Sequence, residues 1–263
     1  MAADLPDVRL ESDLFTGPLV ELWGVLFDLS EQVPDAWSLI GGQMVLLHGL
    51  EHGRTPPAAS ADLDVLADVQ SDQQSLRRLV AALERLGFSP AGMSPQGNLL
   101  HRYQRGVEPQ RLVVDLLAPD NLGPRADLTT TPPGRTLEVP GGRQAAQRTE
   151  AVSVRLGPRT GRIRRPSLLG AIVAKAAAVS IKTASPERHY RDLAFLLSLP
   201  ANPLQLRDQL DKGDRKKLAF AKTLHDSQHA AWRQLPDESV RADGQAMYAF
   251  LSPSPSPSLS PSP

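Results

Sequence analysis

The chain has 263 residues, and the last 13 (251–263) form a Ser/Pro-rich tail. The remainder is long enough for one large domain or two ordinary ones. A 41% apolar and 22% charged composition is typical of a globular protein, and the absence of cysteine excludes disulfides, thiol nucleophiles and Cys-ligated metals. The start is acidic and no apolar run is long enough to span a bilayer, so we expect a cytoplasmic protein.

The net charge of zero conceals an uneven distribution of charged residues. Residues 1–134 contain 9 Lys and Arg against 18 Asp and Glu, whereas residues 135–191 contain 12 against 3. The second segment therefore has a net charge of +9, which could attract a polyanion such as RNA or a triphosphate. The alternative is an arginine-rich hairpin that is simply solvated, because charge runs alone are weak evidence.

Hydrophobic periodicity and Gly/Pro positions predict the elements of the first part of the chain. In chain order they are a helix over 18–29, a strand over 37–40 ended by Gly41-Gly42, a helix over 43–50, a strand over 61–66, and a helix that follows a capping box at Ser71 and Gln74 and ends at Gly87.

Strands continue to residue 163, and the pattern then becomes helical. The predicted strands are 99–105, 111–117, 136–139, 151–156 and 161–163, and the predicted helices lie near 166–182, 186–198, 203–211, 214–235 and 238–250. This order predicts an α/β (α+β) fold with a mixed β-sheet core over 1–165, an all-helical part over 166–250 and a disordered tail over 251–263.

Asp62 and Asp64 alternate with apolar residues in a predicted strand, so their carboxylates share one face. Such a pair can bind Mg²⁺, which holds and activates a triphosphate. Asp115 interrupts an otherwise apolar run over 112–117, where a carboxylate must ligate a metal or be paired. The alternative for Asp115 is an ion pair with an arginine such as Arg102 or Arg54.

Two further features point to an anionic ligand. Gly41 and Gly42 separate a strand from a helix, where backbone N–H groups can approach a phosphate, although such a pair is more often only a turn. Lys175 lies within an apolar helix and needs an anion, which a phosphate or Asp192 would supply; the alternative is a lysine that reaches solvent. Asp192 could equally form an ion pair within its own helix.

These residues resemble the nucleotidyltransferases of the polymerase-β type, in particular the AbiEii-like toxin group. The resemblance spans about 19–198 and rests on WSLIGGQM at 37–44, Arg54, SADLDV at 60–65, Asp115, GAIVAKA at 170–176 and RHYRDL at 188–193. Arg54 departs from the family pattern, because it lies eight positions before Asp62 instead of about four.

The resemblance implies a nucleotidyltransferase core with specific roles for its residues. Asp62, Asp64 and Asp115 would bind Mg²⁺, and Lys175 would act in catalysis. Contacts to the NTP would come from Gly41, Gly42, Ser60, Lys175 and Asp192.

The implied reaction is Mg²⁺-dependent transfer of a nucleoside monophosphate from an NTP to a hydroxyl. The implied acceptor is RNA, in particular tRNA, and the implied partner is a cognate antitoxin. The alternatives are a small-molecule (antibiotic-type) nucleotidyltransferase and a catalytically inactive binding module.

A zinc hydrolase is a rival from another class, since the segment 48–52 matches H-x-x-E-H. Glycines shorten its helix, and no third ligand is evident.

Overall fold

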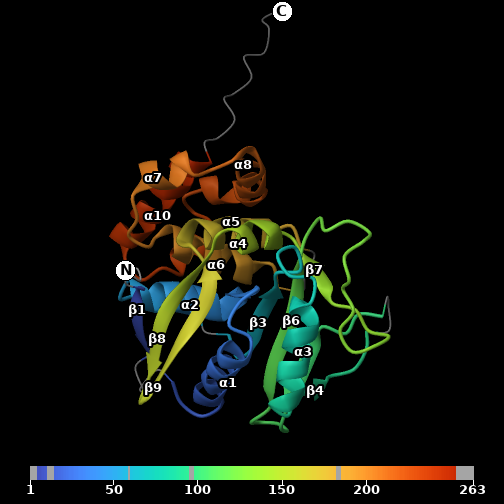
Figure 1. The fold of residues 1–263 in the computed structure, drawn as a ribbon. Helices are drawn as coiled ribbons and strands as arrows, with labels where there is room; N and C mark the ends of the chain where they lie inside the picture. The colour runs from blue at the N-terminus through green and yellow to red at the C-terminus, as the bar shows by residue number, and fades with distance from the viewer. Residues whose placement is uncertain (1–4, 11–14, 59, 95–97, 182–184, 253–263) are drawn as a thin grey trace, which may run out of the picture.

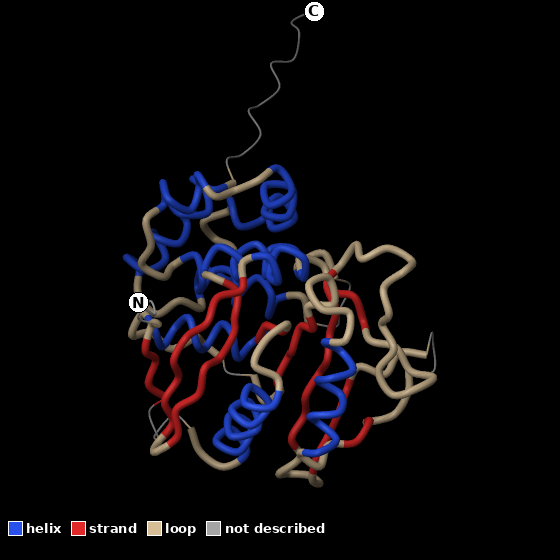
Figure 2. The backbone as a smooth tube through the Cα atoms, viewed as in Figure 1, coloured by secondary structure: helices blue, strands red, loops and turns tan. Residues whose placement is uncertain are grey.

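The computed structural model describes residues 5–10, 15–58, 60–94, 98–181 and 185–252. The predicted α/β class with a mixed β-sheet is confirmed: two sheets occupy one end of the molecule and the helices of the C-terminal part gather at the other (Figures 1 and 2). Of the helices in the described part of the chain, none has the length and apolarity needed to cross a bilayer.

The larger sheet has six strands and carries the predicted carboxylates. Its order is β2 (Trp37–Ile40), β3 (Leu63–Ala67), β6 (Leu112–Pro119), β5 (Arg102–Arg105), β4 (Ser89–Pro90), with β7 (Leu137–Val139) also paired to β6. β3 and β6 run parallel, whereas β2 and β5 are antiparallel to their neighbours. The central strand β6 is nearly continuously buried, as its apolar sequence predicts.

The smaller sheet contains the arginine-rich hairpin. Its order is β1 (Asp7–Leu10), β8 (Thr149–Leu156), β9 (Arg159–Pro166), with β1 parallel to β8. The sequence did not predict β1, which is only four residues long. Val8 and Leu10 alternate toward the core there, and their partner strand lies more than 140 residues away in the chain.

Four helices accompany the sheets. They are α1 (Pro18–Gln32), α2 (Gly41–Glu51), α3 (Ser75–Arg85) and the short α4 (Gly142–Gln147), which was not predicted. The capping box predicted at Ser71 and Gln74 is wrong. Ser71 lies in a preceding turn held by Asp68, and the N–H of Gln74 donates to Asp72 Oδ1 (2.8 Å).

The C-terminal part is helical, as predicted. Its elements are α5 (Leu168–Ala178), α6 (Glu187–Leu197), α7 (Pro203–Asp208), α8 (Lys212–Leu218), a 3₁₀ helix (Ala219–His225), α9 (Ala230–Arg233) and α10 (Glu238–Leu251). The single helix predicted over 214–235 is wrong, because the chain kinks at Ala221, where φ and ψ leave the helical region. This bend lets Trp232 enter the core and donate to the Leu224 carbonyl (3.0 Å).

One buried hydrophobic cluster includes side chains from both sheets and from the C-terminal helices, for example Leu39, Ile172 and Trp232. The division at residue 165 therefore stays a prediction, with no break in the core to mark it. The tail predicted to be disordered is 251–263. The prediction is wrong for Leu251, which is the last residue of α10, and residues 253–263 lie outside the described residues.

Candidate active site

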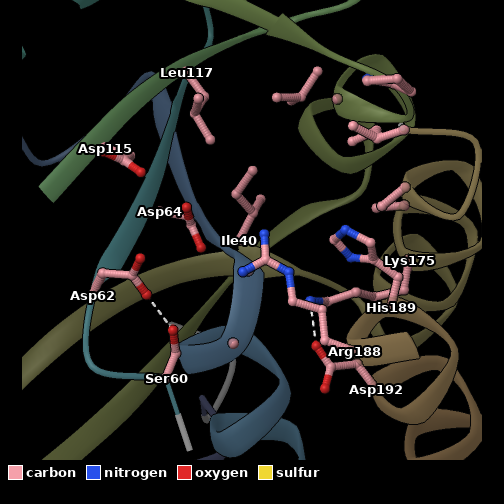
Figure 3. A pocket seen from close by; sticks show the side chains of 18 of the residues that line it. Ile40, Ser60, Asp62, Asp64, Asp115, Leu117, Lys175, Arg188, His189 and Asp192 are labelled. Atoms are coloured by element: carbon pink, nitrogen blue, oxygen red, sulfur yellow. Dashed lines mark hydrogen bonds and ion pairs between the residues drawn. The ribbon is translucent and has the colours of Figure 1, made fainter. Parts of the chain in front are cut away.

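Three carboxylates meet where β3 and β6 lie side by side. The parallel register places Asp64 directly opposite Asp115. Asp62 precedes β3, which begins two residues later than the sequence predicted, and the Ser60 hydroxyl donates to Asp62 Oδ1 (Figure 3). Oxygen atoms of Asp62, Asp64 and Asp115 all lie within 4.8 Å of one another. The fold thus brings together the three residues that the sequence singled out.

This donor set suits Mg²⁺, a hard cation that prefers carboxylate oxygens. Burial, followed by repulsion from Asp62 and Asp115, raises the pKa of Asp64 to about 7. A carboxylate so destabilised by its neighbours gains most from a bound cation. Among the described residues, Asp62, Asp64 and Asp115 form a group whose side chains are close enough together to hold a metal ion.

Asp115 is also paired with an arginine, which is the alternative that the sequence left open. Arg102 binds it with two parallel hydrogen bonds, Nε to Oδ1 (2.8 Å) and Nη2 to Oδ2 (2.7 Å). Arg54 takes no part, since its guanidinium donates to the Ser198 carbonyl. The departure of Arg54 from the family pattern therefore has a structural reason: it joins the N-terminal half to the end of α6.

Gly41 and Gly42 let the first turn of α2 approach the carboxylates closely. A Cβ on Gly41 would lie 1.8 Å from Asp64 Oδ2, and the φ of Gly41 is +70°, a conformation that L side chains rarely adopt. A Cβ on Gly42 would lie 2.4 Å from the Cβ of Ser60. Both glycines begin the helix instead of ending the strand, so the N-terminus of α2 lies beside the carboxylates.

Cationic groups face the carboxylates from α5 and α6. Lys175 is buried and donates to Asp192 Oδ2 (2.7 Å), so of the alternatives for Lys175 the pair with Asp192 is the one observed. Arg188 extends from α6 toward Asp64 (Figure 3) and forms no ion pair with any residue that the structure describes. A cation that points into a pocket without a partner is suited to an anionic ligand.

A cavity of about 610 Å³ contains all of these groups, including the eight residues predicted for the site. The sequence did not predict its apolar wall, which is formed by Leu117, Leu137, Val139, Pro140, Ala178 and Ile181. The sequence predicted the strand that contains Leu137 and Val139, but its apolar pattern did not show which side chains face the cavity.

His189 is a second unpredicted contributor to the cavity. Burial, with Lys175 and Arg188 nearby, lowers its pKa to about 4, so the ring is neutral at pH 7. Neither ring nitrogen has a hydrogen-bond partner among the described residues. The sequence signal was present in the segment 188–193, but helical periodicity does not show which of its side chains turns inward.

The H-x-x-E-H segment at 48–52 forms structural contacts between α2 and β9. His48 is buried and engaged at both ring nitrogens, Nε2 with the Pro166 carbonyl (3.0 Å) and Nδ1 with Arg165. Arg165 is 1% exposed and also pairs with Glu51. His48 and Glu51 of this motif thus belong to a network that joins α2 to β9, and the His48 imidazole is not free to bind zinc.

The basic segment 135–191 is partly neutralised by acidic residues. Among the cations that the structure describes in this segment, six form ion pairs, namely Arg148, Arg155, Arg159, Arg165, Lys175 and Arg191. Several of these pairs reach across the fold, as from Arg159 to Asp28 (2.7 Å). Part of the +9 charge therefore connects β8 and β9 to the acidic half of the chain.

No family model matches the chain, and no curated protein matches it. Among solved structures, an antigenic nucleotidyltransferase-like protein from Paracoccidioides brasiliensis is similar, with a TM-score of 0.44 and 14% identity, over 76% of this chain and 86% of that one. This similarity is too distant to assign a family or an activity. Membership of the AbiEii-like toxin group stays a prediction.

Proposed function

We propose that the protein is a Mg²⁺-dependent nucleotidyltransferase, which transfers a nucleoside monophosphate from an NTP to a hydroxyl acceptor. The observation that carries the proposal is the placement of the Asp62, Asp64 and Asp115 carboxylates in one cavity with Arg188, which has no ion-pair partner among the described residues. Carboxylates suit the metal, and the cation suits the phosphates. The apolar wall is suited to a nucleobase.

In the proposed reaction the acceptor oxygen forms a bond to the α-phosphorus as the bond from that phosphorus to the bridging oxygen of pyrophosphate breaks. The hydroxyl proton passes to water as this bond forms. Bound Mg²⁺ would be held by Asp62, Asp64 and Asp115, and it would neutralise charge on the phosphates. The pyrophosphate leaves with Arg188 and the Lys175–Asp192 pair on its side of the cavity.

The roles of Gly41, Gly42 and Ser60 follow from their positions. The glycines keep the helix N-terminus open to phosphate oxygens, where its N–H groups and dipole favour negative charge. Ser60 orients Asp62 through its hydroxyl and lines the cavity. An inactive binding module would not require Gly41 at a position where any side chain collides with the Asp64 carboxylate.

The resemblance makes RNA, and tRNA in particular, the first candidate acceptor, with a cognate antitoxin as partner. A small hydroxylated molecule is the second candidate. It is favoured by one observation: six of the described cations in the basic segment already have acidic partners, which weakens the attraction of that segment for a polyanion.

The test is incubation of the protein with Mg²⁺, total tRNA and each α-labelled NTP in turn. The proposal expects label in the tRNA band with at least one NTP, and none with Asp62→Asn/Asp64→Asn. Asp127→Asn, which removes a surface carboxylate paired with Arg77, is the matched control and keeps full transfer. Label that persists in the double variant contradicts the assigned carboxylates.

A further inference from the structure

Three charged side chains form a row across adjacent strands of the larger sheet. Asp64 on β3 is in register with Asp115 on β6, and Asp115 is in register with Arg102 on β5. Directly opposite residues on neighbouring strands have Cβ atoms only about 5 Å apart. Asp115 therefore has a carboxylate on one side and a guanidinium on the other.

The guanidinium of Arg102 contacts two of the three carboxylates, as a metal ion would. It binds both oxygens of Asp115, and its Nη2 is also 4.0 Å from Asp62 Oδ2. The Asp115 side chain is 9% exposed, whereas that of Arg102 is 49% exposed and lines the cavity. Hydrogen bonds to Asp115 raise the pKa of Arg102 above its usual value, so the charge is permanent.

We infer that Arg102 takes the place of a second metal ion, so that the site holds one divalent cation where a two-metal site would hold a pair. The inference rests on the proposed function and deepens it. Two-metal sites place their ions about 3.5–4 Å apart with carboxylates between them. Here both oxygens of Asp115 already accept from Arg102. The three carboxylates and one guanidinium have a net charge of −2, which one divalent ion neutralises.

This arrangement has a consequence for the reaction. One Mg²⁺ held by the three carboxylates would serve the phosphates, while Arg102 supplies fixed positive charge beside Asp115. A single positive charge is then present beside Asp115 at any Mg²⁺ concentration. Turnover accordingly follows Mg²⁺ with saturation by a single ion.

The test counts bound Mn²⁺ by the loss of the free-ion EPR signal, with the full chain, MnCl₂ as the probe and no nucleotide, at pH 8. The expected count is one Mn²⁺ per chain for the wild type and two, with Mn–Mn spin coupling, for Arg102→Met. Removing the guanidinium also makes the first Mn²⁺ bind about tenfold tighter, because a nearby positive charge is lost. A residue that only stabilises the fold would change neither quantity.

Arg105→Met is the matched control, because Arg105 lies on the same strand but donates to the Leu86 carbonyl (2.7 Å) and to Glu21 (2.8 Å). It keeps one Mn²⁺. If circular dichroism shows Arg102→Met to be unfolded, Arg102→Gln replaces it, since it removes the charge but keeps a donor.

Two bound Mn²⁺ in the wild type overturn the inference and leave the proposed function intact. If Arg102→Met or Arg102→Gln is folded and still binds only one Mn²⁺, the inference is also overturned. A wild type that binds no Mn²⁺ contradicts both the inference and the proposed function.

Discussion

Gly41→Ala is the substitution that most directly tests whether the helix and the carboxylates must approach each other. The new methyl group would lie 1.8 Å from Asp64 Oδ2, whereas ordinary contact begins at 3.4 Å, so the carboxylate has to move by about 1.6 Å. Displacing a reacting group by about 1 Å can cost roughly 100-fold in rate. Alanine at a φ of +70° also destabilises the fold by about 1–2 kcal/mol.

The assay compares kcat for nucleotide transfer and the thermal midpoint of Gly41→Ala with those of Gly53→Ala. Gly53 ends the same helix at a φ of +66°, and a Cβ there would meet nothing within 4 Å. Both variants therefore place alanine in a strained backbone conformation, but only Gly41→Ala displaces Asp64. We expect similar losses of stability and a loss of kcat of about 100-fold for Gly41→Ala alone. Comparable activity in the two variants refutes the reasoning.

Three further predictions concern the charged groups. The pKa of Asp64 is about 7, above its usual 3.8, so the metal-free protein loses stability as the pH rises from about 4 to about 7. Mg²⁺ binds the ionised form of Asp64. The rise in Tm that Mg²⁺ causes should therefore be larger at pH 8 than at pH 6. An equal rise at both pH values contradicts the pKa assigned to Asp64. Asp192→Asn leaves Lys175 buried without its carboxylate partner and should lower the free energy of unfolding by about 3–5 kcal/mol. The double variant Lys175→Met/Asp192→Leu should recover this stability but not nucleotide transfer. Denaturant unfolding measures the free energy of unfolding of both variants. A double variant no more stable than Asp192→Asn would argue against a buried Lys175–Asp192 ion pair. Arg165→Met leaves Glu51 without its buried partner and should lower Tm with little effect on Mg²⁺ affinity, since that network lies outside the cavity; a large change in Mg²⁺ binding measured by calorimetry would contradict this.

Local signals were sufficient for part of this fold and insufficient for the rest. The strand before Gly41 and the central strand around Asp115 were predictable, because apolar runs and glycines act over a few residues. The register that places Asp64 opposite Asp115 is a long-range property of the sheet, and the sequence supplied only the residue types. The kink at Ala221 had no local signal, since its cause is the burial of Trp232.

The candidate site shows the same division between residue identity and geometry. The predicted carboxylates, glycines and Lys175–Asp192 pair lie together, whereas the inward position of His189 was not predictable. The ion-pair hypothesis for Asp115 is confirmed by Arg102, whereas metal binding by Asp115, which lies in the carboxylate cluster, stays a prediction. The H-x-x-E-H match shows the converse: suitable residues at suitable spacing form an ionic network because Arg165 reaches them from a distant strand.

The most direct test of the central claim is Mg²⁺-dependent release of pyrophosphate from each NTP, measured with total RNA and, separately, with a mixture of small hydroxylated compounds. This readout does not depend on knowing the acceptor. The account predicts release with at least one NTP, abolished by Asp64→Asn and by chelation of Mg²⁺, and unchanged by Asp127→Asn. Release that continues in Asp64→Asn, or no release with any NTP and either acceptor pool, would contradict it.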